Sequence, residues 1–164
     1  MRAGLPKLPG MSTWKEAFRE GLVSGSLASI LSASYLALAG NRRSTPAAPM
    51  NAVSHWIFGD SALREDEPTL AHTATGYVIH HVAAMFWGVL HAKAWGTRPE
   101  AKKPLPAAAG AIAAAGVACF VDYQLTPKRL TPGFEHRLAK PEMTNVYACF
   151  ALGLMIGSLL MKKR

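Results

Sequence analysis

Charged and apolar residues are distributed so that four long uncharged segments alternate with polar loops along the 164-residue chain. Each segment is 18 to 25 residues long, and an α-helix needs about 20 residues to cross roughly 30 Å of hydrocarbon. The uncharged segments are Gly21–Gly40, Pro68–Ala92, Pro104–Val121 and Met143–Met161. We therefore predict an all-α protein, a single integral membrane domain over residues 1–164 built as a four-helix bundle. The predicted spans cover about residues 15–40, 69–95, 105–126 and 142–161.

Two longer polar segments, residues 41–68 and 127–141, connect the spans on the side that we predict to be outside the cell. The stretch MNAVSHWIFG in the first loop is apolar enough to lie on the membrane as a short interfacial helix that carries His55 and ends at Gly59. In the second loop Leu130, Phe134 and Leu138 recur at helical spacing, which predicts a bent segment pressed against the end of the bundle. At the N-terminal side, Thr13 and Glu16 have the spacing of a capping box, so the first helix should begin near Trp14.

Composition and charge support a membrane location. Half of the residues are hydrophobic and only 17% are charged, against about 25% in ordinary soluble domains. The net charge of +8 does not indicate nucleic-acid binding, because the basic residues flank the apolar segments and form no basic face interleaved with aromatic residues. Eleven basic residues lie in the two termini and the middle loop, and seven lie in the other two loops. The positive-inside rule then places both termini in the cytoplasm.

Small residues recur every fourth position in two of the spans, which lets helices approach closely. The predicted packing positions are Gly21, Gly25, Ser29, Ala33, Gly153 and Gly157. The third span is almost entirely Ala and Gly before Cys119, and we expect its neighbours to pack against it on several sides, since such a surface offers little apolar area to lipid. Cys119 and Cys149 are expected to be free thiols, although a disulfide between them is an alternative.

The second span contains His72, His80, His81 and His91. His72, His80 and His91 fall on one helical stripe, and a polar group at membrane depth must face protein or water and be hydrogen-bonded. We expect His80 and His81 to bond to serines of the first span and so fix the register of the two helices. A proton relay or a transport path lined by His72, His80 and His91 is the alternative.

A metal site on the outer side is a further alternative. The predicted topology gathers His55, His72, Asp122 and His136 at similar depth, and these side chains would suit Zn or Cu. The competing interpretation is four separate residues bonded to backbone or water. Haem is disfavoured, because the other three spans contain no histidine that could act as the second axial ligand.

The small-residue first span, the polar loop and a second span with Gly76, His80 and the pair Phe86-Trp87 resemble the uncharacterised bacterial inner-membrane families of the YagU type. The resemblance covers the first two spans and implies a small inner-membrane protein with no established reaction. The sequence has no nucleotide-binding glycine loop, CxxC, HExxH or GxSxG motif, so whether it is an enzyme stays open.

From these features we predict an accessory or structural subunit that packs against a larger membrane complex, with the lipid bilayer and a membrane-protein partner or a second copy as its contacts. A histidine-lined transporter or channel and an outer-face metal-binding protein are the alternatives.

Overall fold

The computed structural model describes residues 12–161, and this part of the chain is helical with no strand. Four longer helices are joined by short helical turns. The four are α1 (Trp14–Asn41), α4 (Thr75–His91), α5 (Pro104–Phe120) and α6 (Lys140–Leu160). The shorter elements are α2 (Ala48–Val53), α3 (His55–Phe58), η1 (Gly59–Arg64), η2 (Leu70–Ala74), η3 (Ala92–Gly96), η4 (Pro99–Lys102), η5 (Val121–Leu125), η6 (Lys128–Leu130) and η7 (Phe134–His136).

Helix α1 begins where the sequence predicts. The Thr13 side chain accepts a hydrogen bond from the Glu16 backbone N–H, and the Glu16 side chain accepts one from the Thr13 backbone N–H. This capping box satisfies two donors that the first helical turn leaves free. With 28 residues, α1 is about 42 Å long at 1.5 Å per residue, which exceeds the roughly 30 Å of bilayer hydrocarbon.

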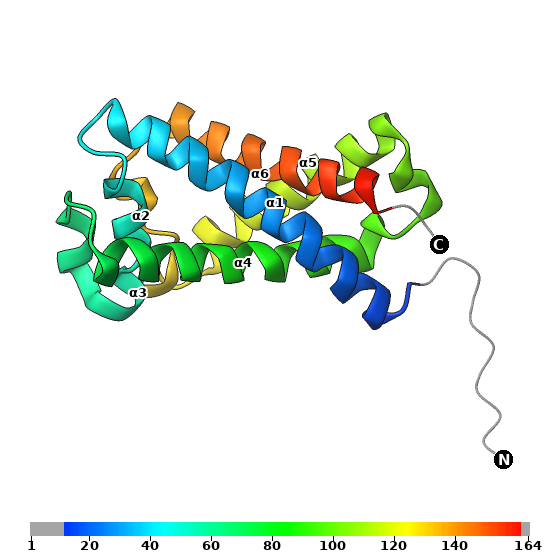
Figure 1. Ribbon diagram of the computed structural model, residues 1–164, viewed down its shortest axis with the longest axis horizontal. Helices are drawn as coiled ribbons and strands as arrows, with labels where there is room; N and C mark the ends of the chain where they lie inside the picture. Colours follow the sequence, from blue (N-terminus) through cyan, green and yellow to red (C-terminus); the bar gives the residue numbers. More distant parts are fainter. Residues whose placement is uncertain (1–11, 162–164) are drawn as a thin grey trace, which may run out of the picture.

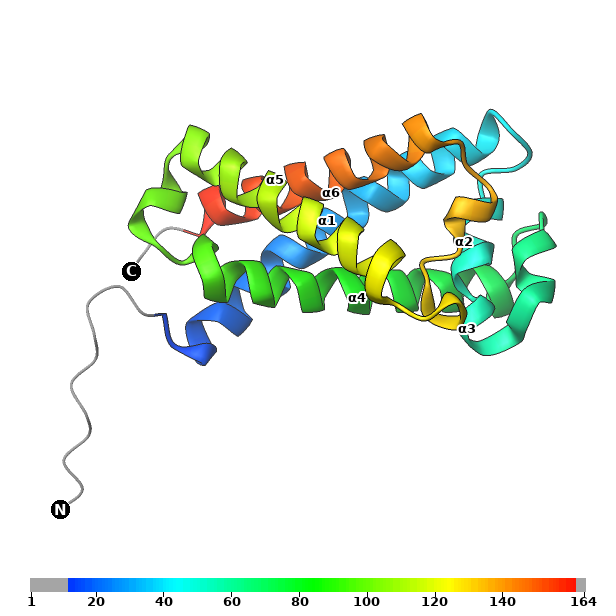
Figure 2. The ribbon, with the colours of Figure 1, turned by 180° about the vertical axis from the view of Figure 1, so that it is seen from behind.

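Helix α1 lies between α4 and α6, and α5 packs on the far side of α6 (Figures 1 and 2). Glycines bring these helices together. A Cβ atom added to Gly25 would lie 2.6 Å from the Met85 Cα of α4, and one added to Gly153 would lie 2.3 Å from the Ala28 Cα of α1. Both crossings therefore depend on the absence of a side chain.

The molecule has two distinct ends. Helices α2 and α3 lie at one end, and the start of α1, the η3–η4 turn and the end of α6 lie at the other (Figure 1). We call these the α2 end and the η4 end.

The segment predicted as a single interfacial helix is two short helices, and its first half is not on the surface. Every residue of α2 is buried, whereas α3 exposes Ile57 and Phe58. The prediction of a surface helix is wrong for α2 because Phe134 and Leu138 of the second loop cover its apolar residues Met50 and Val53 in a common core. The predicted stop at Gly59 is confirmed, since this residue has φ 73° and ends α3.

The loop between α5 and α6 is pressed against the α2 end, as predicted, but as separate short turns. Phe134 and Leu138 are buried, and Trp56 Nε1 donates a hydrogen bond of 2.8 Å to the Thr131 carbonyl. Gly133 adopts φ 91° and a Cβ there would strike the Ala52 carbonyl, so the turn interrupts the helical spacing. Arg137 also forms an ion pair with Asp66 of the first loop, which ties the two loops together.

Helix α5 differs most from expectation. Ala107, Ala111, Ala115 and Ala118 are buried along one side, but the opposite side is exposed, so the expected packing on several sides is wrong within this chain. The cause is the arrangement of neighbours, because α5 packs mainly on α6 and touches α4 only lightly.

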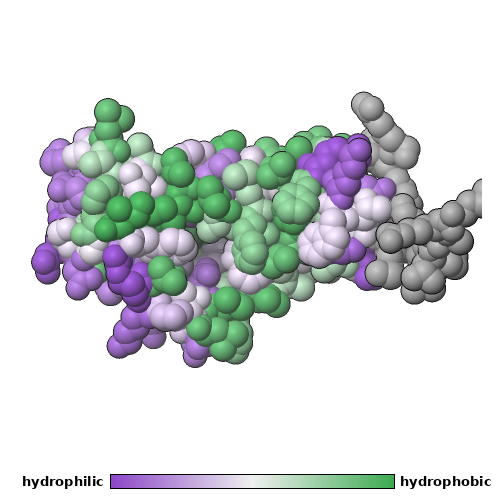
Figure 3. All heavy atoms as spheres, turned by 90° about the horizontal axis from the view of Figure 1, so that it is seen from below, coloured by the Kyte–Doolittle hydropathy of each residue, from purple (hydrophilic) through white to green (hydrophobic). Residues whose placement is uncertain are grey.

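Three helices of the described residues are long and apolar enough to cross a membrane. They are Trp14–Asn41, Pro104–Leu125 and Lys140–Leu160. The fourth predicted span, about residues 69–95, is helical through η2, α4 and η3 but is not among the three. On the face seen in Figure 3, hydrophobic side chains gather over the middle of the molecule and hydrophilic ones toward its ends.

Candidate functional site

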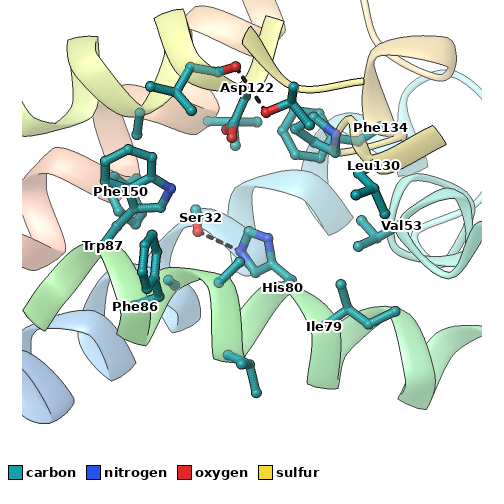
Figure 4. A pocket seen from close by; sticks show the side chains of 18 of the residues that line it. Ser32, Val53, Ile79, His80, Phe86, Trp87, Asp122, Leu130, Phe134 and Phe150 are labelled. Carbon is teal, nitrogen blue, oxygen red and sulfur yellow. Dashed lines mark hydrogen bonds between the residues drawn. The ribbon is translucent and has the colours of Figure 1, made fainter. Parts of the chain in front are cut away.

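A cavity of about 620 Å³ lies between α4 and the pair α5–α6, toward the α2 end (Figure 4). Aromatic and aliphatic side chains form most of its wall, among them Phe86 and Trp87 from α4, Phe150 from α6 and Leu130 from η6. Two polar groups enter this apolar lining from opposite sides: His80 from α4 and Asp122 from η5. A largely apolar cavity with a few convergent polar groups is the usual form of a small-molecule site.

His80 is held by the first span. Its Nε2 lies 2.9 Å from Ser32 Oγ, so the serine contact expected from the sequence is present. The Ser32 hydroxyl has one proton, and it donates to the Ala28 carbonyl at 2.7 Å. Ser32 therefore accepts from His80, Nε2 bears the ring proton, and Nδ1 holds the lone pair.

Asp122 is held by the last helix. The Tyr147 hydroxyl donates a hydrogen bond of 2.6 Å to Asp122 Oδ2, and the Tyr147 ring packs against Tyr123 with centroids 6.2 Å apart. Glu135, a second acid, lies close enough to Asp122 to act on it electrostatically. No basic residue of that range pairs with Asp122.

A second polar cluster lies at the η4 end. Glu20 is only 5% exposed, and Lys102 Nζ donates to both of its carboxylate oxygens at 2.7 Å and to the Ser158 carbonyl at 3.0 Å. His91 is buried nearby, and neither of its ring nitrogens has a hydrogen-bond partner among the described residues. Gly96 makes room for the cluster, since a Cβ there would lie 2.9 Å from Glu20 Oε1.

The remaining histidines of the second span lie in different surroundings. His72 lies at the α2 end, where its ring is 4.8 Å from that of Phe58 and its Nδ1 is 3.2 Å from Thr69 Oγ1. His81 is within 3.5 Å of Ser26 Oγ, at the outer limit of a hydrogen bond. His72, His80 and His91 therefore share a helical stripe but no common cavity.

The four residues proposed as metal ligands also have separate neighbours. His55 Nδ1 bonds to the Ala52 carbonyl at 2.9 Å, His72 contacts Thr69, Asp122 bonds to Tyr147, and His136 is 3.9 Å from Glu135. Within residues 12–161 no group of three or more His, Cys, Asp or Glu side chains is placed to hold a metal ion. Cys119 and Cys149 are free.

The other predicted packing positions lie at helix contacts. Gly21 faces Val89 of α4, and Gly157 faces Ser24 of α1. Ser29 is fully buried and its hydroxyl has no partner among the described residues, while Ala33 is partly buried against the core at the α2 end.

Sequence reasoning missed two polar centres. The first is the pair Glu20 and Lys102, which are 82 residues apart. Each borders an apolar segment, where a charged residue is normally taken to be a solvated residue at the end of a membrane span. The second is Asn51, which is fully buried and donates to the Glu65 and Glu67 carbonyls at 3.0 and 2.9 Å. Its place within an apolar stretch is the one signal that could have revealed it, because a buried amide needs partners.

No protein-family model, curated protein or solved structure matches this chain.

Proposed function

We propose that the chain is a four-span protein of the bacterial inner membrane, with both termini in the cytoplasm. The three apolar helices support integration into a membrane. The fourth span would be the continuous helical segment from Leu70 to Gly96, which runs beside α1 and whose histidines lower its hydropathy. The orientation rests on the excess of basic residues in the two terminal segments and the middle loop of the sequence.

Within that membrane we propose that it acts as an accessory or structural subunit, which binds a larger membrane protein or a second copy through α5. The observation that carries this proposal is the exposed side of α5. Ala109, Ala113 and Gly116 form an exposed small-residue stripe along it, flanked by the exposed Ile112 and Val117. A Cβ added to Gly116 would meet no atom within 4 Å.

The physical reason is the way helices associate in lipid. Lipid tails are as apolar as leucine, so helix association depends on close van der Waals packing, which small residues permit. The buried side of α5 already uses alanines in this way against α6. Small residues on the other side as well give α5 a second surface suited to a close helix contact.

The test compares Gly116→Leu with Ala148→Leu, which adds the same side chain to an exposed position of α6. After purification in a mild detergent, the wild-type protein should carry a partner or a second copy, detected by native mass spectrometry. Gly116→Leu should reduce that association at least several-fold, and Ala148→Leu should leave it unchanged. A wild-type chain that is monomeric in detergent and in lipid nanodiscs would contradict the proposal.

A further inference from the structure

We propose that the cavity between α4 and α5–α6 binds a small lipophilic organic cation, such as a hydrophobic ammonium or phosphonium ion. The positive charge would lie against the Asp122 carboxylate and the apolar body against the aromatic walls. This site goes beyond the proposed packing function, because it lies within the chain and not on the exposed side of α5.

The first argument is the unpaired acid. Glu20 pairs with Lys102, Asp66 with Arg137 and Glu142 with Arg43. Asp122 makes no ion pair with any described residue, although it lines a cavity whose other walls are mostly apolar.

A carboxylate in such a place is costly unless a counter-charge or several donors satisfy it. The Tyr147 hydroxyl supplies one donor, and Glu135 adds negative charge nearby. Arg129 lies in the neighbouring η6 turn but donates to the His55 carbonyl. The cavity thus presents negative charge with no protein cation to balance it.

The second argument is the shape and chemistry of the wall. Phe86, Trp87, Phe150 and Tyr147 bring four aromatic rings to the cavity, and an aromatic face attracts a cation by about 0.5 to 2 kcal/mol depending on its solvation. The volume of about 620 Å³ falls within the roughly 300 to 1,000 Å³ of drug-sized sites.

His80 is compatible with a cation. In the neutral form of the ring the Nε2 proton is engaged with Ser32, and Nδ1 offers its lone pair. The neutral ring adds no positive charge opposite Asp122, and this acceptor would suit an N–H group of an ammonium ligand.

A ligand can reach the cavity from the membrane, between α4 and α5. Helix α4 touches α5 only lightly, and Phe86, which lines the cavity, is 58% exposed. A lipophilic ion concentrated in the bilayer could enter between these helices without passing through water.

The experiment measures equilibrium binding of radiolabelled tetraphenylphosphonium to the purified full-length protein in detergent, with triphenylphosphine oxide as a neutral probe of related shape. Asp122→Asn keeps an acceptor for Tyr147 but removes the charge, and it should weaken tetraphenylphosphonium binding at least tenfold. Asp122→Glu should retain binding, and so should the matched control Glu142→Gln, whose carboxylate lies outside the cavity. The neutral probe should bind equally to wild type and Asp122→Asn.

Ala83→Trp, which places bulk in the cavity wall, should abolish binding of both probes. Thermal unfolding of each variant identifies any that fail to fold. If Ala83→Trp does not fold, the ratio of cation affinity to neutral-probe affinity in Asp122→Asn still tests the role of the charge. The proposal is overturned if the wild type does not bind tetraphenylphosphonium, or if Asp122→Asn binds it as well as the wild type does. Neither result bears on the α5 contact, which Gly116→Leu tests separately.

Discussion

At the scale of single residues, the ion pair between buried Glu20 and partly buried Lys102 ties three elements together. All three ammonium protons of Lys102 have acceptors, two on Glu20 and one at the Ser158 carbonyl. The pair thereby connects α1, η4 and α6 at the η4 end. Burying two charges is costly, and their mutual attraction offsets this cost only while the geometry stays complete.

Removing one partner should therefore be much worse than removing both. Lys102→Met leaves the Glu20 carboxylate buried and unpaired, which should lower the free energy of unfolding by about 3 to 5 kcal/mol. The double variant Glu20→Gln/Lys102→Met should recover most of that loss. Reversible denaturant unfolding in mixed micelles measures both.

The control for this series is Lys103→Met, which removes the same charge from an exposed neighbour and should change stability by no more than about 0.5 kcal/mol. If Lys102→Met were as stable as Lys103→Met, the pair would contribute nothing to the fold.

The residue scale also shows what sequence reasoning can reach. The contact between His80 and Ser32 was predictable, because a histidine at membrane depth needs a partner and the first span supplies serines. The Glu20–Lys102 pair was not, because nothing local links residues 82 positions apart. Asp122 was proposed as a metal ligand together with His55, His72 and His136. The distances between these residues depend on how the two loops fold, and the hydrophobic periodicity of the sequence does not predict loop conformation.

At the scale of elements, the small-residue spacing located the helix crossings. Gly21 and Gly25 face α4, and Gly153 and Gly157 face α1. The same reasoning failed for α5, whose alanines pack on one side only, since a small-residue pattern does not say whether the partner belongs to the same chain. The prediction of a surface helix failed for α2 for a different reason, because hydrophobicity alone cannot distinguish a helix covered by lipid from one covered by a loop.

The crossings give an element-scale prediction. Gly153→Ala would place a Cβ 2.3 Å from the Ala28 backbone, so α1 and α6 must separate, and overpacking of this kind costs about 1 to 3 kcal/mol. Gly116→Ala makes the same change where no atom lies within 4 Å, and should stabilise α5 by up to about 1 kcal/mol through helix propensity. Thermal unfolding of the two variants should thus give shifts of opposite sign, and a Gly153→Ala variant as stable as Gly116→Ala would show that the crossing is not tight.

At the scale of the whole molecule, the two ends differ in how they are held together. The α2 end is a folded cap in which Arg137 of the second loop binds Asp66 and the Leu63 carbonyl of the first, and Asn51 holds the first loop together by bonding to the Glu65 and Glu67 carbonyls. The η4 end has short turns around one buried ion pair. The cavity lies toward the capped end, and residues of the cap such as Val53 and Phe134 form part of its wall. A stable cap would therefore hold Asp122 and His80 in fixed positions relative to each other.

The proposed orientation places the capped end on the periplasmic side of the inner membrane, and it is testable in spheroplasts. In a background with Cys119→Ala and Cys149→Ala, Ser61→Cys adds a thiol at an exposed position of the α2 end, and Lys103→Cys adds one at an exposed position of the η4 end. Because basic residues are retained on the cytoplasmic side, a membrane-impermeant maleimide should label Ser61→Cys in spheroplasts and Lys103→Cys only after lysis. The reverse pattern would show that the orientation is the opposite of the one proposed. Labelling of both thiols in sealed spheroplasts would place the two positions on one side of the membrane and would argue against α4 as a span.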